Sequence, residues 1–207
     1  MEKRPGSGPE PVHVWIAPAG DEPRSAAHNL LVDLASTLVS SPALRHESNG
    51  KPCIDGHAVS ISHSRELVVV AASQAGPVGV DVEEVFPREI GGLARRWFDP
   101  AELEWMTTQS DELTAFLQLW TAKEAVGKAL GNGLRKAGLR RRMPLGGGLV
   151  ESAPGLLVTQ LPIRDDAVLA VAVASAATDV LVTEHQGTAL RRTVTSRTSF
   201  PVVVRGN

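Results

Sequence analysis

The chain lacks several features that would define a class of protein at once. Among its 207 residues there are one cysteine and no tyrosine, and aromatic residues make up only 4%. The lone Cys53 excludes an intramolecular disulfide and a metal site built from cysteines. Aromatic packing must therefore come from tryptophan and phenylalanine.

An excess of one charge and long apolar runs are also missing. The formal net charge is −2, whereas general nucleic-acid binders carry a clear basic excess. The longest apolar runs, Leu67–Ala72 and Ala167–Ala174, are too short to span a bilayer. The first residues, MEKRPGSGPEP, lack the apolar core of a secretory signal. We therefore expect a cytoplasmic enzyme or binding protein that engages neither nucleic acid nor membrane.

The spacing of apolar residues predicts a mixed α+β fold. Helical spacing covers Arg24–Val39 and Asp111–Leu130, and glycines end the second segment. Two short helices are predicted at Glu89–Trp97 and Pro100–Met106. Strands are predicted at His13–Ile16, Val59–Ile61, Leu67–Ala72, Val78–Val85, Leu156–Leu161 and Val168–Ala174. Strand-like pieces at Val180–Val182 and Val202–Val204 receive no place in this scheme.

Strict alternation along Val78–Glu83 brings two carboxylates to one face of a strand. The three valines point one way, so Asp81 and Glu83 share the opposite face, about 7 Å apart along the backbone. Two carboxylates at this spacing can converge on one hard cation such as Mg²⁺. A half-exposed strand with a polar outer face explains the same pattern.

The long helix carries two charges where its first half predicts burial. Its apolar residues lie at i, i+3, i+4 and i+7, and this stripe leads to Glu124 and Lys128. A charge on a buried face requires a partner. Glu124 and Lys128 can form a simple i,i+4 ion pair, but that pair does not explain their position. The position favours a functional role.

Three further segments carry polar groups suited to a phosphate or to a partner. Ser62-His63-Ser64 lies between two predicted strands, where hydroxyls and an imidazole suit phosphate oxygens. A Ser–His nucleophilic pair and a capped turn are the alternatives. Lys51 precedes a proline in a turn that is not a P-loop. A basic run can steer an acidic partner or form a solvated face, and it consists of Arg135, Lys136, Arg140, Arg141 and Arg142.

In this order the segments resemble the 4′-phosphopantetheinyl transferase superfamily, in its broad-specificity type that serves polyketide and nonribosomal peptide synthetases. The motifs that carry the resemblance are Gly50-Lys51-Pro52, Ser60-Ile61-Ser62-His63-Ser64, Gly79-Val80-Asp81-Val82-Glu83 and Trp120-Thr121-Ala122-Lys123-Glu124-Ala125-Val126-Gly127-Lys128. The resemblance covers Arg24 to Leu134 and is weaker up to Ala174.

The resemblance implies a magnesium-dependent enzyme. It would transfer the 4′-phosphopantetheine group of coenzyme A to a serine of an apo acyl or peptidyl carrier protein, releasing 3′,5′-ADP, and we expect it to act as a monomer. By position, the residues that resemble the Mg²⁺ ligands are Asp81, Glu83 and Glu124. Glu124 and Lys128 are the expected catalytic residues.

The same comparison implies the contacts to coenzyme A. These are Lys51, Pro52, Ser62, His63, Lys123 and Lys128. The family often carries a basic residue in the first helix that grips the 3′-phosphate. The stretch Asn29–Thr37 has none, so Arg24 or Arg45 is expected to take its place.

The resemblance also implies a pseudo-dimer of two α+β halves with the active site between them. We expect a disordered lead-in at 1–11, an N-terminal half at 12–75, a C-terminal half with the metal site at 76–179, and a tail of unknown role at 180–207. Two other functions use the same residues. One is a metal-dependent phosphohydrolase acting on a nucleotide, and the other is a non-catalytic module that binds coenzyme A or a carrier protein.

Overall fold

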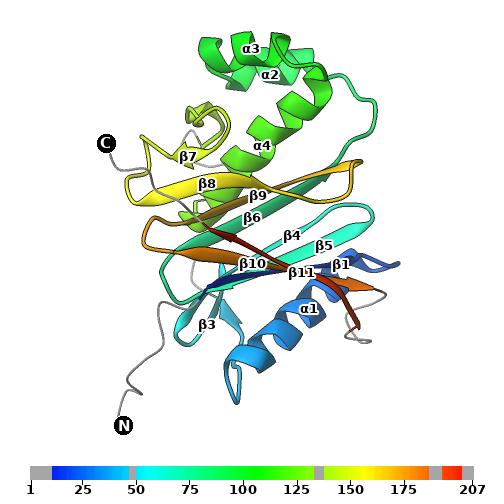
Figure 1. Cartoon of the computed structure of the whole chain (residues 1–207), viewed down its shortest axis with the longest axis vertical. Helices are drawn as coiled ribbons and strands as arrows, with labels where there is room; N and C mark the ends of the chain where they lie inside the picture. Colours follow the sequence, from blue (N-terminus) through cyan, green and yellow to red (C-terminus); the bar gives the residue numbers. More distant parts are fainter. Residues whose placement is uncertain (1–10, 47–49, 133–137, 187–192, 202–207) are drawn as a thin grey trace.

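The structure is a computed structural model that describes residues 11–46, 50–132, 138–186 and 193–201. It confirms the mixed α+β fold, with two β-sheets in the middle and helices on the outer faces (Figure 1). The lead-in expected at 1–11 lies outside the described residues except for Pro11, and so does the strand-like piece Val202–Val204. None of the helices in the described ranges is long and apolar enough to cross a membrane.

The first sheet has seven strands in the order β11-β10-β1-β5-β4-β3-β2. Helix α1 (Pro23–Leu38) covers one of its faces through Leu30, Leu31 and Leu34. The strands are β1 (Val12–Pro18), β2 (Arg45–His46), β3 (Pro52–Ile54), β4 (His57–His63), β5 (Leu67–Ser73), β10 (Asp179–Gln186) and β11 (Thr193–Pro201). The piece Val180–Val182, which had no predicted place, pairs in parallel with Val12–Val14.

The second sheet has four strands in the order β6-β9-β8-β7, all antiparallel. The strands are β6 (Val78–Glu84), β7 (Gly148–Leu149), β8 (Leu156–Leu161) and β9 (Ala167–Ala174). The short helices α2 (Gly91–Trp97) and α3 (Pro100–Thr107), the long helix α4 (Glu112–Ala129) and a 3₁₀ turn at Gly138–Arg140 complete this part of the chain.

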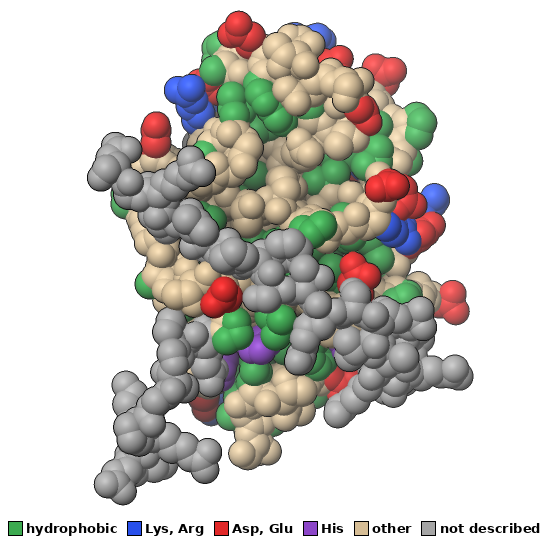
Figure 2. Space-filling model, viewed as in Figure 1, with side chains coloured by type: hydrophobic (Ala, Val, Ile, Leu, Met, Phe, Trp, Pro, Cys, Tyr) green, Lys and Arg blue, Asp and Glu red, His purple; other side chains and the backbone are tan. Residues whose placement is uncertain are grey.

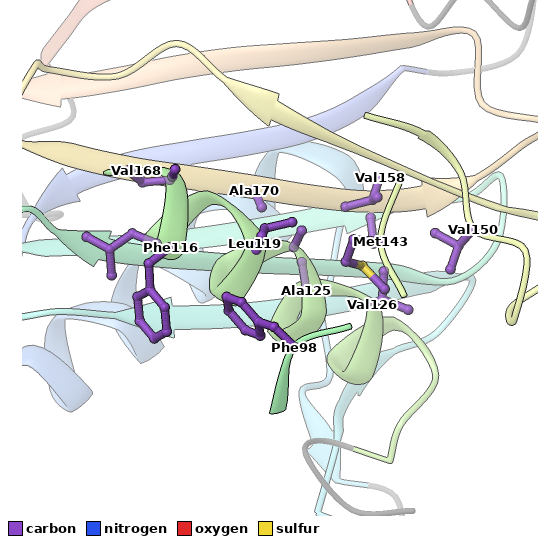
Figure 3. Packing of buried hydrophobic residues seen from close by; sticks show 14 of the residues in the cluster. Phe98, Phe116, Leu119, Ala125, Val126, Met143, Val150, Val158, Val168 and Ala170 are labelled. Atoms are coloured by element: carbon purple, nitrogen blue, oxygen red, sulfur yellow. The ribbon is translucent and has the colours of Figure 1, made fainter. Parts of the chain in front are cut away.

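The hydrophobic core lies in three layers. Valines of β6 and β9 pack against β1 and β5, which joins the two sheets face to face. The outer face of the second sheet packs against α4 through Phe116, Leu119 and Val126, as Figure 3 shows. Because β6 has one face on the other sheet and one on α4, its alternate residues meet two different environments.

Helix α4 approaches β6 so closely that only glycine fits between them. A Cβ atom added to Gly79 would lie 2.0 Å from the carbonyl oxygen of Ala125 and 2.6 Å from the backbone nitrogen of Ala129. Both are backbone atoms, so relief would require the helix to move. Gly79 therefore sets the distance at which α4 carries its side chains over the strand.

We predict that Gly79→Ala destabilises the protein by about 3 kcal/mol or more, because overpacking against backbone leaves no side chain free to shift. Urea unfolding followed by tryptophan fluorescence measures the change. Gly92→Ala in α2 is the matched control, since a Cβ there meets nothing within 4 Å. A Gly79→Ala variant as stable as the control would contradict this packing.

Candidate active site

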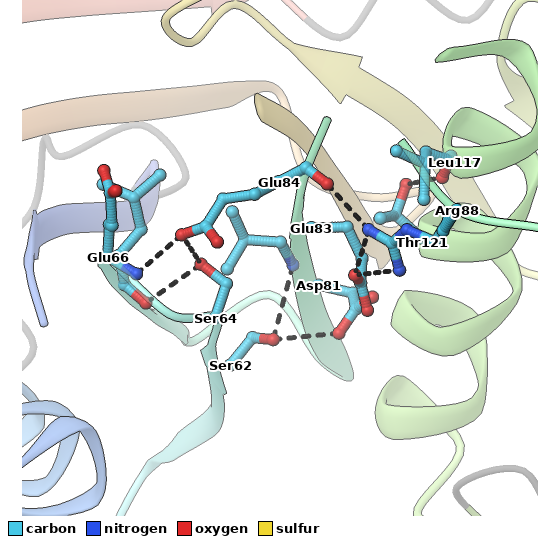
Figure 4. Close-up of polar contacts among 11 residues, drawn as sticks. Ser62, Ser64, Glu66, Asp81, Glu83, Glu84, Arg88, Leu117 and Thr121 are labelled. Atoms are coloured by element: carbon cyan, nitrogen blue, oxygen red, sulfur yellow. Dashed lines mark hydrogen bonds and ion pairs between the residues drawn. The ribbon is translucent and has the colours of Figure 1, made fainter. Parts of the chain in front are cut away.

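Asp81 lies at the centre of a buried polar cluster between β4, β6 and α4 (Figure 4). Its side chain belongs to the face of β6 that also carries Gly79, as the alternation predicted, and the residue is only 6% exposed. The Ser62 hydroxyl donates to Asp81 Oδ1 over 2.8 Å. The Lys128 ammonium donates to the same oxygen over 2.8 Å and to the Val80 carbonyl over 3.0 Å. Burial raises the pKa of Asp81, and Lys128 and Ser62 oppose that shift.

The second oxygen of the Asp81 carboxylate, Oδ2, differs from the first in having no partner among the described residues. Within the described part of the chain, Oδ2 of Asp81 is buried and has no hydrogen-bond partner. A buried polar atom without a partner is unfavourable by about 1–3 kcal/mol, and more for a charged group. Native structures satisfy nearly all such atoms with protein groups, ordered water or a ligand, so this oxygen is a candidate position for a bound cation.

Glu83 lies two residues further along the same strand and is held by an arginine. Both terminal nitrogens of Arg88 donate to Glu83 Oε2 over 3.2 Å. The same guanidinium donates to the Glu84 carbonyl over 2.7 Å and stacks over the Phe86 ring at 4.2 Å. Burial and then the neighbouring Asp81 raise the pKa of Glu83, while Arg88 opposes the shift.

Glu124 reaches the cluster from α4. Burial, followed by repulsion from Asp81, raises its pKa to about 7, and Lys128 one helical turn away only partly offsets this. Glu83 also repels it. Asp81 is thus close enough to Glu83 and Glu124, the other two predicted metal ligands, to raise the pKa of both. The predicted i,i+4 pair alone does not describe the site, because the Lys128 ammonium is bonded to Asp81.

The carboxylates do not form a closed metal cage. Within the described residues, no group of three or more His, Cys, Asp or Glu side chains is arranged so that it could hold a metal ion as it stands. Glu83 is turned toward Arg88, which explains in part why the three carboxylates do not converge on one point. The donor set nevertheless fits a hard divalent cation, since it offers carboxylate oxygens that repel one another and one buried oxygen without a partner.

An open hollow of about 410 Å³ adjoins this cluster on the side of Glu83. Glu83, Glu84, Ser64, Arg65 and Phe86 line it. Ser64 and the backbone N–H of Glu66 both donate to Glu84 Oε1, over 2.9 and 2.6 Å. These bonds join the end of β4 and the turn before β5 to the end of β6. A molecule in the hollow would contact Glu83, which is one of its lining residues.

The predicted coenzyme contacts do not lie in one place. Lys51 lies near the end of α4, whereas His63, Arg24 and Arg45 are exposed on the surface. Lys51, next to Pro52 at the start of β3, donates to the carbonyl of Ala129 over 3.0 Å and so meets the end of the helix that carries Lys128. His63 is exposed at the end of β4. Arg24 lies exposed on α1. Arg45, on β2, forms an exposed ion pair with Asp55.

Lys123 does not join these residues, which corrects the assignment made from the sequence. Its ammonium donates to both oxygens of Glu102 over 2.8 Å and to the carbonyl of Arg141. Both charged side chains are fully buried. A lysine has three donors and all three are used here, so none is left for coenzyme A.

This buried pair joins several elements. Glu102 also accepts the backbone N–H groups of Asp99 and Met143 over 2.8 Å. It thereby caps α3 and ties the segment after α4 to the helix. Sequence reasoning missed Glu102 as a partner, although Asp99-x-x-Glu102 is a capping-box pattern. Arg88 was also missed, and the sequence carries no signal for it.

Of the basic run predicted from the sequence, the structure describes Arg140, Arg141 and Arg142. Arg135 and Lys136 lie outside the described residues. The Arg140 guanidinium stacks over the Trp97 ring at 5.6 Å, which connects the run to α2. On the face shown in Figure 2, Lys and Arg side chains lie at the margins among acidic ones rather than in one broad patch.

Comparison with known proteins identifies similar chains of one superfamily. Residues 77–145 match the family model described as the 4′-phosphopantetheinyl transferase superfamily, and this segment contains Asp81, Glu83, Glu124 and Lys128. The resemblance predicted from the sequence is confirmed at the level of the superfamily.

Three curated relatives are 4′-phosphopantetheinyl transferases. HetI of Nostoc sp. is 33% identical over 140 residues, which is 62% of this chain and 59% of HetI. The gsp protein of Aneurinibacillus migulanus is 38% identical over 44% of this chain and 38% of its own length. The psf-1 protein of Bacillus pumilus is 33% identical over 55% of this chain and 58% of its own length. The chain thus covers less than two thirds of each relative.

We predict that Lys123→Met lowers the free energy of unfolding by about 3–5 kcal/mol, because Glu102 would remain buried without its partner. Urea unfolding measures the change. Arg164→Met is the matched control, since it breaks exposed pairs with Glu66 and Asp166, each worth at most about 1 kcal/mol. Equal, small losses in both variants would contradict the structural role of Lys123.

Without metal, the acidic cluster should make the protein less stable as the pH rises. Burial raises the pKa values of Asp81, Glu83 and Glu124, so the folded state keeps protons that the unfolded state releases around the ordinary values of 3.8 for aspartate and 4.5 for glutamate. Stability is therefore lost between about pH 4.5 and 7. We expect the melting temperature in EDTA to fall by a few degrees across this interval.

Glu124→Gln should flatten this dependence. The difference between the variant and the wild type isolates Glu124, because His185, whose pKa is lowered by burial, contributes a slope of the opposite sign in both proteins. Identical pH profiles for the two proteins would show that Glu124 ionises freely in the folded state.

Proposed function

We propose that this protein transfers the 4′-phosphopantetheine group of coenzyme A to a serine hydroxyl of an apo acyl or peptidyl carrier protein. The observation that carries the proposal is Asp81, with its unpartnered Oδ2 and Lys128 beside it, next to Glu83 and Glu124, whose pKa values it raises. These residues fall within the segment that matches the transferase superfamily. The names of the three relatives support the same activity.

Mg²⁺ would be held by Asp81, Glu83 and Glu124, with Asp81 Oδ2 as the best-prepared oxygen. When bound, the ion would polarise the phosphoryl oxygens of coenzyme A and offset the charge of the leaving group. The side chains of Glu83 and Glu124 have to draw in toward Asp81 for this, since they do not form a cage as they stand.

The remaining chemistry belongs to residues of the chain. The serine oxygen of the carrier attacks the β-phosphorus, the bond from that phosphorus to the leaving phosphate oxygen breaks, and 3′,5′-ADP departs. Glu124, directly or through a water that it orients, would accept the serine proton. Lys128 supplies a fixed positive charge next to the pyrophosphate. Alignment and charge screening supply most of the rate enhancement.

Coenzyme A would lie across the junction of the two sheets. Lys51 and Pro52 approach the end of α4 from the first sheet, and exposed His63 ends the neighbouring strand. Arg24 or Arg45 would hold the 3′-phosphate, and Arg45 would have to exchange its exposed pair with Asp55 for that contact. The open hollow beside Glu83 would receive the group that is transferred.

We also infer that the chain is a pseudo-dimer divided near Gly76, with halves at 12–75 and 76–179. In the first half, β1 is followed by α1 and then β4 and β5, and the strands lie in the order β1-β5-β4. In the second half, β6 is followed by α4 and then β8 and β9, in the order β6-β9-β8. This repeated order supports two similar halves with the active site at their boundary, and β10 of the tail then extends the first half. The proposal includes a monomer that acts in the cytoplasm.

We predict that an apo carrier protein incubated with this enzyme, coenzyme A and Mg²⁺ gains the mass of one phosphopantetheine, as measured by intact-protein mass spectrometry. EDTA should abolish the gain, and Glu124→Gln should slow it by about 100-fold or more because the proton acceptor is lost. Glu112→Gln is the matched control, since this residue lies exposed in the first turn of the same helix.

Two results would favour other functions. Hydrolysis of coenzyme A without modification of the carrier would favour a phosphohydrolase. Tight coenzyme A binding that survives Glu124→Gln, with no mass gain on any carrier, would favour a binding module.

A further inference from the structure

Strands β4 and β6 belong to different sheets but are connected by a row of serines. Every second residue of the segment 60–64 directs a hydroxyl at every second residue of β6. Ser60 accepts the backbone N–H of Val80 over 3.1 Å, and Ser62 accepts that of Val82 over 3.3 Å. Ser64 donates to the Glu84 carboxylate. The row fixes the register between the two strands.

Ser62 differs from the other members because it also holds a carboxylate of the proposed metal site. Its hydroxyl donates to Asp81 Oδ1 over 2.8 Å, and the residue is 94% buried, since only 6% of its surface is exposed. A serine hydroxyl has a single proton to donate. The hydrogen bond drawn between Ser62 and Asp81 in Figure 4 uses that proton.

The hydrogen bond to Asp81 competes with the contact to coenzyme A that the resemblance assigns to Ser62. Phosphate oxygens are hydrogen-bond acceptors, so a serine must donate its proton to bind one. Ser62 can do so only by releasing Asp81. His63 points to the opposite face of the same strand, because neighbouring residues of a strand alternate, and that face packs toward α1 through Val59 and Ile61.

We propose that Ser62 is a positioning residue for Asp81 rather than a donor to the phosphates of coenzyme A. Ser62 and Lys128 hold the same oxygen, Oδ1, and together they leave Oδ2 as the oxygen presented to a cation. This inference rests on the proposed Mg²⁺ site. It assigns Ser62 the part that outer-shell hydrogen bonds play around metal-binding carboxylates.

The test compares Ser62→Ala with Ser60→Ala in the full chain. Both variants remove a hydroxyl that accepts a backbone N–H of β6, but only the first removes a bond to Asp81. With Mn²⁺ alone as the probe, followed by paramagnetic resonance, we expect Ser62→Ala to weaken binding by about 10-fold or more. Ser60→Ala should stay within about 2-fold of wild type. Coenzyme A binding in EDTA, measured by calorimetry, should be equal in wild type and Ser62→Ala.

A second variant guards against a folding defect. Ser62→Cys keeps a similar volume and offers only a weak S–H donor, so it should fold and still bind Mn²⁺ more weakly than wild type. Wild-type Mn²⁺ affinity in both Ser62 variants would overturn the positioning role, as would a loss of coenzyme A binding in EDTA. If wild type and Asp81→Asn bound Mn²⁺ equally weakly, the metal site itself would fail and the inference with it.

Discussion

The close packing of α4 on β6 is the constraint on which the rest of the structure depends. Gly79 lets the helix backbone come within contact distance of the strand. At that distance Lys128 reaches Asp81 and Glu124 enters the field of two strand carboxylates. A residue with a side chain at position 79 would push the helix away and separate the charges. The proposed metal site therefore depends on the absence of a Cβ atom at position 79.

Helix α4 contributes side chains to two buried charged clusters. The clusters differ in whether all their charged atoms have hydrogen-bond partners. The ammonium of Lys123 has its three donors occupied, and both oxygens of Glu102 accept hydrogen bonds. Such a closed network fixes structure. The cluster around Asp81 contains three carboxylates, and one buried oxygen has no partner among the described residues. That deficit destabilises the protein alone, and in the proposed function the bound cation would remove it.

Local patterns in the sequence predicted much of this arrangement. Alternation placed Asp81 and Glu83 together, and the apolar stripe of α4 led to Glu124 and Lys128. Both periods are properties of one element, so they can be read without knowledge of the fold. Pro100 is a local signal of the same kind, and the helix predicted to begin there begins at Pro100 in the structure.

Interactions between distant segments could not be predicted in this way. Lys123 bonds to Glu102, 21 residues earlier, and nothing in the local spacing separates it from a lysine that binds a ligand. The hydroxyl of Ser62 turns to Asp81, 19 residues later, because β4 and β6 come together only in the folded chain. The parallel pairing of β10 with β1 joins segments more than 150 residues apart in the sequence, roughly the size of a whole domain.

The central claim is that Asp81, Glu83 and Glu124 together bind one divalent cation that engages coenzyme A. The most direct test is a crystal structure with Mn²⁺ and coenzyme A, in which anomalous scattering locates the metal. The account predicts one anomalous peak about 2 Å from Asp81 Oδ2, with oxygens of Glu83, Glu124 and the pyrophosphate completing its ligands. Bound coenzyme A without a peak there, or a peak that does not involve these carboxylates, would contradict it.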